Sequence, residues 1–373
     1  MQASNNISQA ELDQTMVSII QRIATGPDLS KDIELEEARM GMAALLEEAV
    51  DPVRAAIFLI ALRMKRETRE ENRGVLQAIL DHVDRAVADV DEVVDIADPY
   101  DGYNRTIPAS PFLAPLLAEY GLHVVTHGLD AVGPKYGITH RHVLQAAGVD
   151  VDQSTRAAAA RLSDQSLGWA YVDQAQFAPK LHDLIDLRRK MIKRSVITTV
   201  EVLAKPIVGR ERTHFVTGYV HKPYPPVYAD LARLAGFDSA VLVRGVEGGV
   251  IPSLRQAGKY FGYHDLGEEI GHDIAPAELG IEQEARCVPI PEDVPQTAKG
   301  EGAITVTDIP AGARKAAALG MAALQGEKGA TYDSLVYSGA IILRHLGKAA
   351  TLSEGAEVLR SVLDSGKAAA RVR

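Results

Sequence analysis

Apolar residues along the first part of the chain recur with the three- and four-residue spacing of amphipathic helices. Asp51 before Pro52 marks a helix start, because the carboxylate can cap free N–H groups and proline suits the first helical position. Thr68, followed three residues later by Glu71, fits a capping box. The predicted helices span residues 9–24, 33–49, 52–65 and 72–83. We therefore expect residues 1–85 to form a helical N-terminal domain.

From residue 86 onward, short β-branched runs alternate with helical segments. The expected strands are 93–97, 122–126, 168–172, 215–220, 240–244 and 304–307. The expected helices are 111–120, 139–147, 179–195, 224–235, 309–324, 334–346 and 352–368. Such alternation predicts a mostly parallel sheet flanked by helices. The expected fold class is therefore α/β, with a small helical domain, 1–85, and a large domain, 86–373.

The loop 98–106, with the sequence DPYDGYNRT, connects an expected buried strand to an expected helix. In α/β proteins such loops bind anions, because backbone N–H groups and the amino end of a helix meet there. A phosphate-binding loop usually contains several glycines, which let the backbone approach the ligand, and this loop has only Gly102. An ordinary connecting turn is therefore the alternative to an anion site.

Composition and charge narrow the class of protein. The 373 residues are 46% hydrophobic and 24% charged, as in a globular protein with a full core. The amino terminus has no signal-peptide pattern, there is no run typical of a membrane helix, and Cys287 is the single cysteine, so we expect a cytoplasmic protein without disulfides. Cys287 lies in an apolar stretch that predicts a buried thiol. The net charge of −10 opposes general affinity for nucleic acid.

A local exception is the segment 188–194, which holds five basic residues in seven positions. In a continuous helix, Lys190 would share a face with Arg194, and Arg189 with Lys193. A solvated helix face is the ordinary explanation of such a run. The surrounding residues 180–222 nevertheless hold ten bases and four acids, so a groove that attracts phosphate is the second interpretation.

Histidines offer fewer clues. His127 follows an apolar strand, where a structural histidine and a ligand-binding one are both plausible. His140 and His142 stand at a helix start without a carboxylate or cysteine at metal-ligand spacing, so we expect no metal site there. His264 and His272, in a glycine-rich stretch, are expected at the surface.

The run 55–68, AAIFLIALRMKRET, resembles a motif in the N-terminal helices of anthranilate phosphoribosyltransferases. Weaker similarity lies at Ser338-Gly339-Ala340 and at Ser353-Glu354-Gly355-Ala356, so the resemblance covers nearly the whole chain. It implies a small α domain and a large α/β domain, an architecture shared with nucleoside phosphorylases. It also implies a homodimer that pairs through the helical domain, which agrees with the nearly all-apolar stretch 55–62.

The active-site motifs of this family are altered. The glycine-rich loop that binds the diphosphate of phosphoribosyl diphosphate falls on 101–105, and of the next motif only His127 and Gly128 remain. The acidic pair that holds magnesium in the family falls on Val250 and Ile251, which cannot ligate a hard cation. We therefore expect no metal cofactor. The resemblance places two ligand-binding arginines on Arg188 and Arg194.

These observations suggest a member of a divergent subfamily whose transferase activity is lost or altered and which binds a small anionic or phosphorylated ligand in the cleft between its domains. A phosphoribosyl or other glycosyl transferase with a changed donor or acceptor, a small-molecule sensor, and a non-catalytic homodimer that binds single-stranded nucleic acid through the basic segment are the alternatives. The residues expected to bind the small ligand are Asp101, Gly102, Tyr103, Asn104, Arg105, Thr106, His127, Gly128, Arg188 and Arg194. Those expected to bind nucleic acid are Arg189, Lys190 and Lys193.

Overall fold

The computed structural model describes residues 8–26, 28–297 and 306–373. The chain divides into two compact units, one of residues 1–83 and 178–204 and the other of residues 84–177 and 205–373. A single boundary after residue 85 does not describe this division, because residues 178–204 return to the helical unit after the first strands of the other unit.

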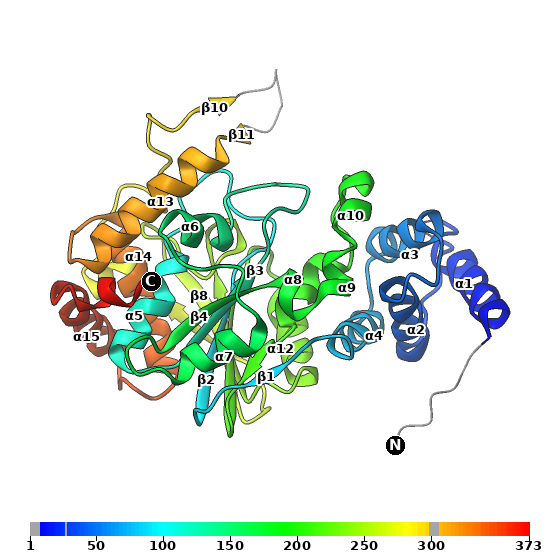
Figure 1. The fold of residues 1–373 in the computed structure, drawn as a ribbon, viewed down its shortest axis with the longest axis horizontal. Coiled ribbons are helices and arrows are strands. Elements are labelled where there is room, and N and C mark those ends of the chain that lie inside the picture. The colour runs from blue at the N-terminus through cyan, green and yellow to red at the C-terminus, as the bar shows by residue number, and fades with distance from the viewer. Residues whose placement is uncertain (1–7, 27, 298–305) are drawn as a thin grey trace. The chain divides into compact units, whose positions relative to one another are not determined.

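Four capped helices form the amino-terminal part of the helical unit (Figure 1). They are α1 (Gln9–Ile23), α2 (Leu35–Leu46), α3 (Pro52–Lys65) and α4 (Arg69–Leu80). Asp51 caps α3 by accepting hydrogen bonds from the backbone of Val53 and Arg54, at 3.0 and 3.1 Å. Thr68 and Glu71 form a capping box at the start of α4. Both predicted caps are confirmed, and α4 begins directly after Thr68, three residues before the expected start at residue 72.

The returning segment is not the single helix expected over residues 179–195. It consists of α9 (Pro179–His182), α10 (Ile185–Met191), α11 (Ile197–Val200) and a 3₁₀ turn, η2 (Glu201–Leu203). Ile192 ends α10 in a left-handed conformation, with φ of 66°. Lys193 and Arg194 therefore lie beyond the helix, and the expected pairing of Arg189 with Lys193 and of Lys190 with Arg194 on one helix face is wrong.

A seven-stranded sheet forms the centre of the second unit, with the strand order β4-β3-β2-β6-β7-β8-β9. Its strands are β2 (Glu92–Ala97), β3 (Val124–Gly128), β4 (Trp169–Asp173), β6 (Arg212–Tyr219), β7 (Ser239–Arg244), β8 (Gly258–His264) and β9 (Ile270–Ile274). The first five are parallel, which confirms the mostly parallel sheet. The antiparallel β8 and β9 were not predicted. For β9 the reason is that most of its residues are exposed and show no apolar alternation.

Two short strand pairs accompany this sheet. β1 (Ala86–Val87) pairs with β5 (Ile207–Val208), and β10 (Gln296–Thr297) with β11 (Val306–Thr307). Of the strand expected over residues 304–307, residues 304 and 305 lie outside the described part of the chain. The other two belong to β11 and not to the central sheet.

Helices and 3₁₀ turns connect the strands of this unit. They are η1 (Ser110–Phe112), α5 (Leu113–Tyr120), α6 (His140–Ala146), α7 (Thr155–Ser163), α8 (Gln174–Phe177), α12 (Tyr224–Leu234), η3 (Val246–Gly248), η4 (Pro276–Leu279), α13 (Ile309–Leu324), α14 (Ala330–His345), α15 (Leu352–Asp364) and η5 (Lys367–Arg371). Gly121 ends α5 in a left-handed conformation, as expected of a glycine cap. The short, alanine-rich α7 was not predicted.

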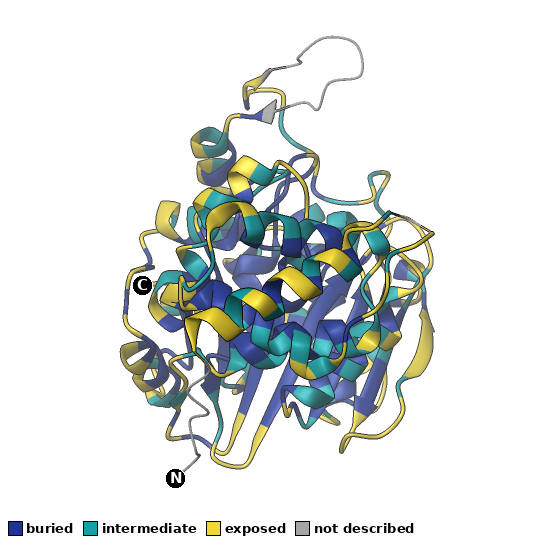
Figure 2. Cartoon of the chain, turned by 90° about the vertical axis from the view of Figure 1, so that its right-hand side faces the viewer, coloured by how far each residue is buried: buried dark blue, intermediate teal, exposed yellow. Residues whose placement is uncertain are grey.

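One part of the core of the second unit lies between its sheet and helices α5, α13, α14 and α15. Figure 2 shows strands of the sheet as largely buried and the outward faces of helices as exposed. Trp169 and Tyr171 on β4 are fully buried, as expected of core residues. Cys287, by contrast, is only half-buried, so the expectation of a core thiol is wrong. Burial and the nearby charge of Glu247 raise the pKa of this thiol.

The strand order places a topological switch point between β2 and β6. From β2 the chain continues through α5 to β3 on one side, whereas from β6 it continues through α12 to β7 on the other. In open parallel sheets, the carboxyl ends of the strands at such a point leave a crevice that binds ligands. The loop 98–106 follows β2 directly, so the fold brings it to this position.

Within the described ranges, no helix combines the length and apolar character needed to cross a membrane.

A group of histidines lies at the opposite, amino edge of the parallel strands. His214, at the start of β6, and His345, at the end of α14, both contact the hydroxyl of Ser239, at 2.8 and 2.9 Å. The ring of His264 stacks on His345, with centroids 4.1 Å apart. Burial lowers the pKa of His345 to about 3, and the neighbouring histidines act in the same direction. His264 and His272 are exposed, as expected.

His345 should make stability depend on pH. Its pKa is lower in the folded than in the unfolded protein, so the unfolded chain binds the proton first and stability falls as pH drops below about 6.5. Between about pH 7 and 5.5, we expect the free energy of unfolding to fall by about 1 kcal/mol more in the wild type than in His345→Gln. Urea titrations at both pH values measure this difference, with the exposed His221→Gln as the matched variant. Equal losses in the wild type and His345→Gln would contradict the assignment.

Candidate functional site

Asp98, the first residue after β2, is the centre of a buried hydrogen-bond network. Its Oδ2 accepts hydrogen bonds from the Tyr103 hydroxyl at 2.6 Å and from the Ser110 hydroxyl, and contacts His140 Nε2 at 2.9 Å. Its Oδ1 accepts the backbone N–H of Val250 at 2.9 Å. Burial alone would raise the pKa of Asp98, but the charge of His140 and these hydrogen bonds outweigh it and hold the pKa below its usual value.

Tyr103 turns its side chain inward, toward Asp98 and the turn after β7. It is 4% exposed, and burial together with the adjacent Asp98 carboxylate raises its pKa well above the usual value. A Cβ atom at Gly249 would overlap its hydroxyl, so only glycine allows the turn after β7 to approach this closely. The backbone of Tyr103 pairs with that of Ile138, at 3.0 and 2.8 Å. The side chain therefore joins the loop to the turn after β7.

The backbone of the loop binds an anion that belongs to the chain itself. The Glu247 carboxylate, in the turn after β7, accepts the N–H groups of Asn104 at 3.2 Å and Arg105 at 2.9 Å. It also accepts the Thr106 hydroxyl at 3.1 Å. The predicted anion-binding character of this loop thus has a structural counterpart, with an internal carboxylate in the place of a ligand.

Lys135 supplies the cation beside this carboxylate. Its Nζ lies 3.8 Å from Glu247 Oε2 and 3.3 Å from Asp101 Oδ1. It also donates hydrogen bonds to the backbone carbonyls of Gly102 and Glu247, at 2.9 and 3.1 Å. The ammonium is therefore fixed at the rim of the loop by contacts that do not depend on the Glu247 carboxylate.

The other loop residues serve its shape. Gly102 adopts φ of +73°, and a Cβ atom there would overlap the backbone of Gly137. The Asn104 amide donates to the Lys135 carbonyl at 3.1 Å. Arg105 extends its side chain to solvent, whereas Asp101 is buried. The donors that this loop offers to an anion are mainly its backbone N–H groups, as expected of a loop in this position, together with the Thr106 hydroxyl.

His127, on β3, is 1% exposed and lies in a separate buried chain of hydrogen bonds. Its Nε2 contacts Asp95 Oδ1 at 2.8 Å, its Nδ1 contacts the Tyr100 hydroxyl, and the edge of Phe177 packs against its ring. Gly128 is buried beside Tyr171. Of the two interpretations of His127, the structure favours the structural one.

The basic segment belongs to the helical unit. Arg188 is 5% exposed and forms a bidentate ion pair with Glu201, with two N–O distances of 2.7 Å. The Arg188 guanidinium therefore already binds a carboxylate. Although Arg188 was predicted to bind the ligand, it has no exposed donor. Arg189, Lys190, Lys193 and Arg194 are exposed. Among these, Arg189 forms an ion pair with Asp186 at 2.8 Å.

Two further predictions concern metal binding, one at His140 and His142 and the other at Val250 and Ile251. His140 and His142 do have carboxylate neighbours in space, Asp98 at 2.9 Å and Asp130 at 3.0 Å, although none at close sequence spacing. Among the described residues, no group of three or more His, Cys, Asp or Glu side chains could hold a metal ion. Val250 and Ile251 are buried, with exposed fractions of 0% and 8%.

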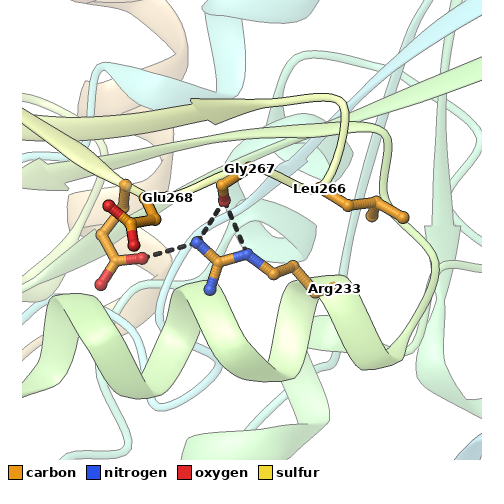
Figure 3. Close-up of a pocket in the computed structure, with 5 residues that line it drawn as sticks. Arg233, Leu266, Gly267 and Glu268 are labelled. Atoms are coloured by element: carbon orange, nitrogen blue, oxygen red, sulfur yellow. Dashed lines mark hydrogen bonds and ion pairs between the residues drawn. The ribbon is translucent and has the colours of Figure 1, made fainter.

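A surface pocket of about 450 Å³ lies elsewhere, between α12 and the turn that joins β8 to β9. Figure 3 shows the Arg233 guanidinium in this pocket directed at the Gly267 carbonyl and a neighbouring carboxylate. That carboxylate is Glu269, at 2.6 Å. Because the β8–β9 turn follows His264, which pairs with the first residue of β7, the pocket lies at the edge of the sheet opposite the loop.

Sequence reasoning missed Asp98, Lys135 and Glu247 as members of the site. The position of Asp98 directly after a buried strand was a usable signal, because such residues meet at one edge of a parallel sheet. Glu247 offered none, since its partner Thr106 lies 141 residues earlier in the chain.

Residues 17–83 match the helical bundle domain of the glycosyl transferase family. An uncharacterised protein of Aquifex aeolicus is 32% identical over 225 residues, which cover 60% of this chain and 66% of that protein. An anthranilate phosphoribosyltransferase of Novosphingobium aromaticivorans is 27% identical over 344 residues, 92% of this chain and 95% of that enzyme.

Solved structures show the same fold. The anthranilate phosphoribosyltransferase of Thermus thermophilus superposes with a TM-score of 0.69 at 22% identity, covering 96% of this chain and 97% of that one. The enzyme of Saccharomyces cerevisiae, in complex with phosphoribosyl diphosphate and magnesium, gives a TM-score of 0.75 at 16% identity, with coverage of 98% and 96%.

The Asp98 network makes a prediction about stability. Tyr103→Phe removes one donor from a buried carboxylate without changing the packed ring, and should lower the free energy of unfolding by about 1 to 3 kcal/mol. Tyr136→Phe, at an exposed tyrosine near the same loop, is the matched control and should change it little. Chemical denaturation of the three proteins decides the question, and equal stability of Tyr103→Phe and the wild type would contradict the role given to this hydroxyl.

Proposed function

We propose that this anthranilate phosphoribosyltransferase-like protein, which carries the helical bundle domain of the glycosyl transferase family, has lost phosphoribosyl transfer from phosphoribosyl diphosphate to anthranilate and binds a single oxyanion on its loop 98–106. The observation that carries the proposal is the Glu247 carboxylate on the N–H groups of Asn104 and Arg105. A loop that holds a carboxylate in this way has donors for one anionic group.

The number and position of the donors support the binding of one anionic group and not of a diphosphate. Two backbone N–H groups, the Thr106 hydroxyl and the Lys135 ammonium converge on the carboxylate. The space beyond them is filled from within, because the Tyr103 ring packs against Gly249 and its hydroxyl binds Asp98. A diphosphate carries more charge than these donors can neutralise, and its transfer requires strong stabilisation of the leaving group.

Magnesium, which the resemblance implies, does not fit the residues present. At the two positions that correspond to the metal carboxylates, Val250 and Ile251 offer buried hydrocarbon, and Mg²⁺ requires oxygen ligands. The backbone N–H of Val250 also donates to Asp98. We therefore assign no step to a metal ion. If activity remains, it would be a glycosyl transfer with another donor or acceptor. A cytoplasmic location belongs to the same proposal.

The enzymatic part of the proposal is tested by turnover. The purified protein should show no formation of phosphoribosyl anthranilate from anthranilate, phosphoribosyl diphosphate and Mg²⁺. Val250→Asp combined with Ile251→Glu should not restore it, because Tyr103 still occupies the loop. An active anthranilate phosphoribosyltransferase in the same assay is the positive control. Turnover by the wild type would show that the altered loop tolerates the diphosphate.

A homodimer through the helical unit is a second part of the proposal. On α3, Ala55, Phe58 and Leu62 face the core of the unit, so most of the apolar stretch 55–62 is used internally. Val53 and Met64, at the two ends of this helix, are 68% and 73% exposed. The half-buried Ile57 and Ile60 lie between them at helical spacing, so apolar side chains continue along one face of α3, and such a contiguous patch is typical of a surface that binds a partner.

Light scattering tests the dimer. At micromolar concentration, we expect the mass of two chains for the wild type. Val53→Asp combined with Met64→Asp should shift the protein toward the mass of one chain, because charge in an apolar interface is costly. Leu29→Asp, at an exposed leucine outside α3, is the control. A wild-type monomer would overturn the proposal.

Binding of single-stranded nucleic acid is a second candidate function, favoured by the exposure of Arg189, Lys190, Lys193 and Arg194. If these side chains contact phosphates, affinity should fall steeply with salt as counterions are released. Lys190→Gln combined with Lys193→Gln should weaken binding and reduce the slope by about one unit per lost contact. Fluorescence anisotropy with single-stranded DNA at two salt concentrations measures both effects, and absence of binding by the wild type at low salt excludes this function.

A further inference from the structure

We propose that Glu247 is a displaceable internal anion that closes the oxyanion site on loop 98–106, so that a phosphoryl group must compete with it to bind. The inference rests on the proposed function of that loop. It adds a regulatory element, a carboxylate of the chain that excludes weak anions and yields to a phosphate monoester.

The contacts of Glu247 are those of a bound ligand. Each carboxylate oxygen accepts hydrogen bonds from the loop, Oε2 from Asn104 N and Oε1 from Arg105 N and the Thr106 hydroxyl. The contacts to backbone N–H groups are available to any oxyanion of similar size. A phosphoryl group presents three oxygens and more negative charge than a carboxylate, so the same donors and Lys135 would hold it more strongly.

The location of Glu247 allows it to leave. Its side chain is 9% exposed, so it lies at the rim of the loop and not in the core like Asp98. The turn that carries it is held by other bonds, from Gly245 N to the Tyr219 carbonyl at 3.2 Å and from Val246 N to the Ile251 carbonyl at 3.0 Å. Rotation of the carboxylate away from the loop would leave these bonds intact.

The backbone of Glu247 is in an unfavourable conformation. Its φ of 53° lies in the left-handed region, which residues other than glycine seldom adopt. Glycines follow immediately at positions 248 and 249, so the adjoining backbone can accommodate a change. Strain of this kind persists where surrounding contacts impose it and is typical of switching segments. The residue that carries the internal anion is therefore a strained position of the turn.

Lys135 remains available when Glu247 leaves. Two of its hydrogen bonds are to backbone carbonyls, and Asp101 lies 3.3 Å away, so its position does not require the Glu247 carboxylate. Once the carboxylate rotates out, the ammonium and the loop N–H groups would face an incoming anion together. A small phosphate monoester fits this set of donors, and inorganic phosphate is its simplest probe.

The test is a calorimetric titration of the full-length protein with inorganic phosphate at constant ionic strength. If Glu247 competes for the site, phosphate can bind only to the fraction of molecules in which the Glu247 carboxylate has left the loop. Glu247→Ala should therefore raise the affinity by the inverse of that fraction, an increase that we expect to be at least about tenfold. Glu247→Gln keeps the shape, loses the charge and should give an intermediate gain. Glu357→Ala, which removes an exposed carboxylate on α15, is the charge-matched control and should bind like the wild type.

A second variant and a second measurement locate the binding. Lys135→Gln in the Glu247→Ala background should abolish most of the gain. Cys287 provides a local probe, because Ile107 N donates to Val288 O at 3.0 Å and this segment thus lies beside the loop. Bound phosphate should slow alkylation of Cys287 in Glu247→Ala. If Glu247→Ala proves unstable, Glu247→Gln supplies the same comparison.

The outcomes separate the two proposals. Binding by the wild type as tight as by both Glu247 variants would overturn the internal competitor and leave the oxyanion site standing. Absence of binding by all variants up to about 10 mM phosphate, weaker than any ordinary site, would overturn the site itself and the competitor with it.

Discussion

The buried charge of Asp98 is the constraint on which the arrangement of the site depends. A carboxylate removed from water is strongly destabilising unless hydrogen-bond donors replace the lost solvent. Here the partners come from four separate places, the loop after β2, η1, the start of α6, and the turn after β7. Because each of them is needed, the loop and the turn after β7 cannot separate without exposing a charge that lacks partners.

This constraint explains why two carboxylates so close in space have different roles. Asp98 is saturated with donors inside the unit and acts as a fixed connection. Glu247 lies at the rim on hydrogen bonds that any oxyanion could accept, with a backbone conformation that opposes its position. The first carboxylate holds the loop in shape, and that shape presents the N–H groups that the second one occupies. The result that we propose is a rigid loop with an exchangeable anion.

Local pattern predicted most of the framework. Asp51, Thr68 and Gly121 carry capping chemistry that acts within a few residues, so the helix ends they mark were accessible from sequence. The loop after β2 was also correctly located, because the apolar run of a buried parallel strand stops where the strand ends. Long-range pairing was not accessible. Arg188 resembled a ligand-binding residue until the structure placed Glu201 against it, and nothing in the segment 244–250 indicates contact with residues 104–106. The edge strand β9 was missed because its mostly exposed side chains lack the apolar signal.

We propose that this fold presents no site for a metal-bound diphosphate. It is tested most directly by calorimetric titration of the wild-type protein with phosphoribosyl diphosphate, with and without Mg²⁺. If Val250, Ile251 and Tyr103 have replaced the metal and diphosphate contacts, affinity should be weak and the same in both conditions. Tight binding that appears only with Mg²⁺ would contradict the account. It would require oxygen ligands for the metal, which Val250 and Ile251 lack, and loop N–H groups that we assign to the internal contact with Glu247.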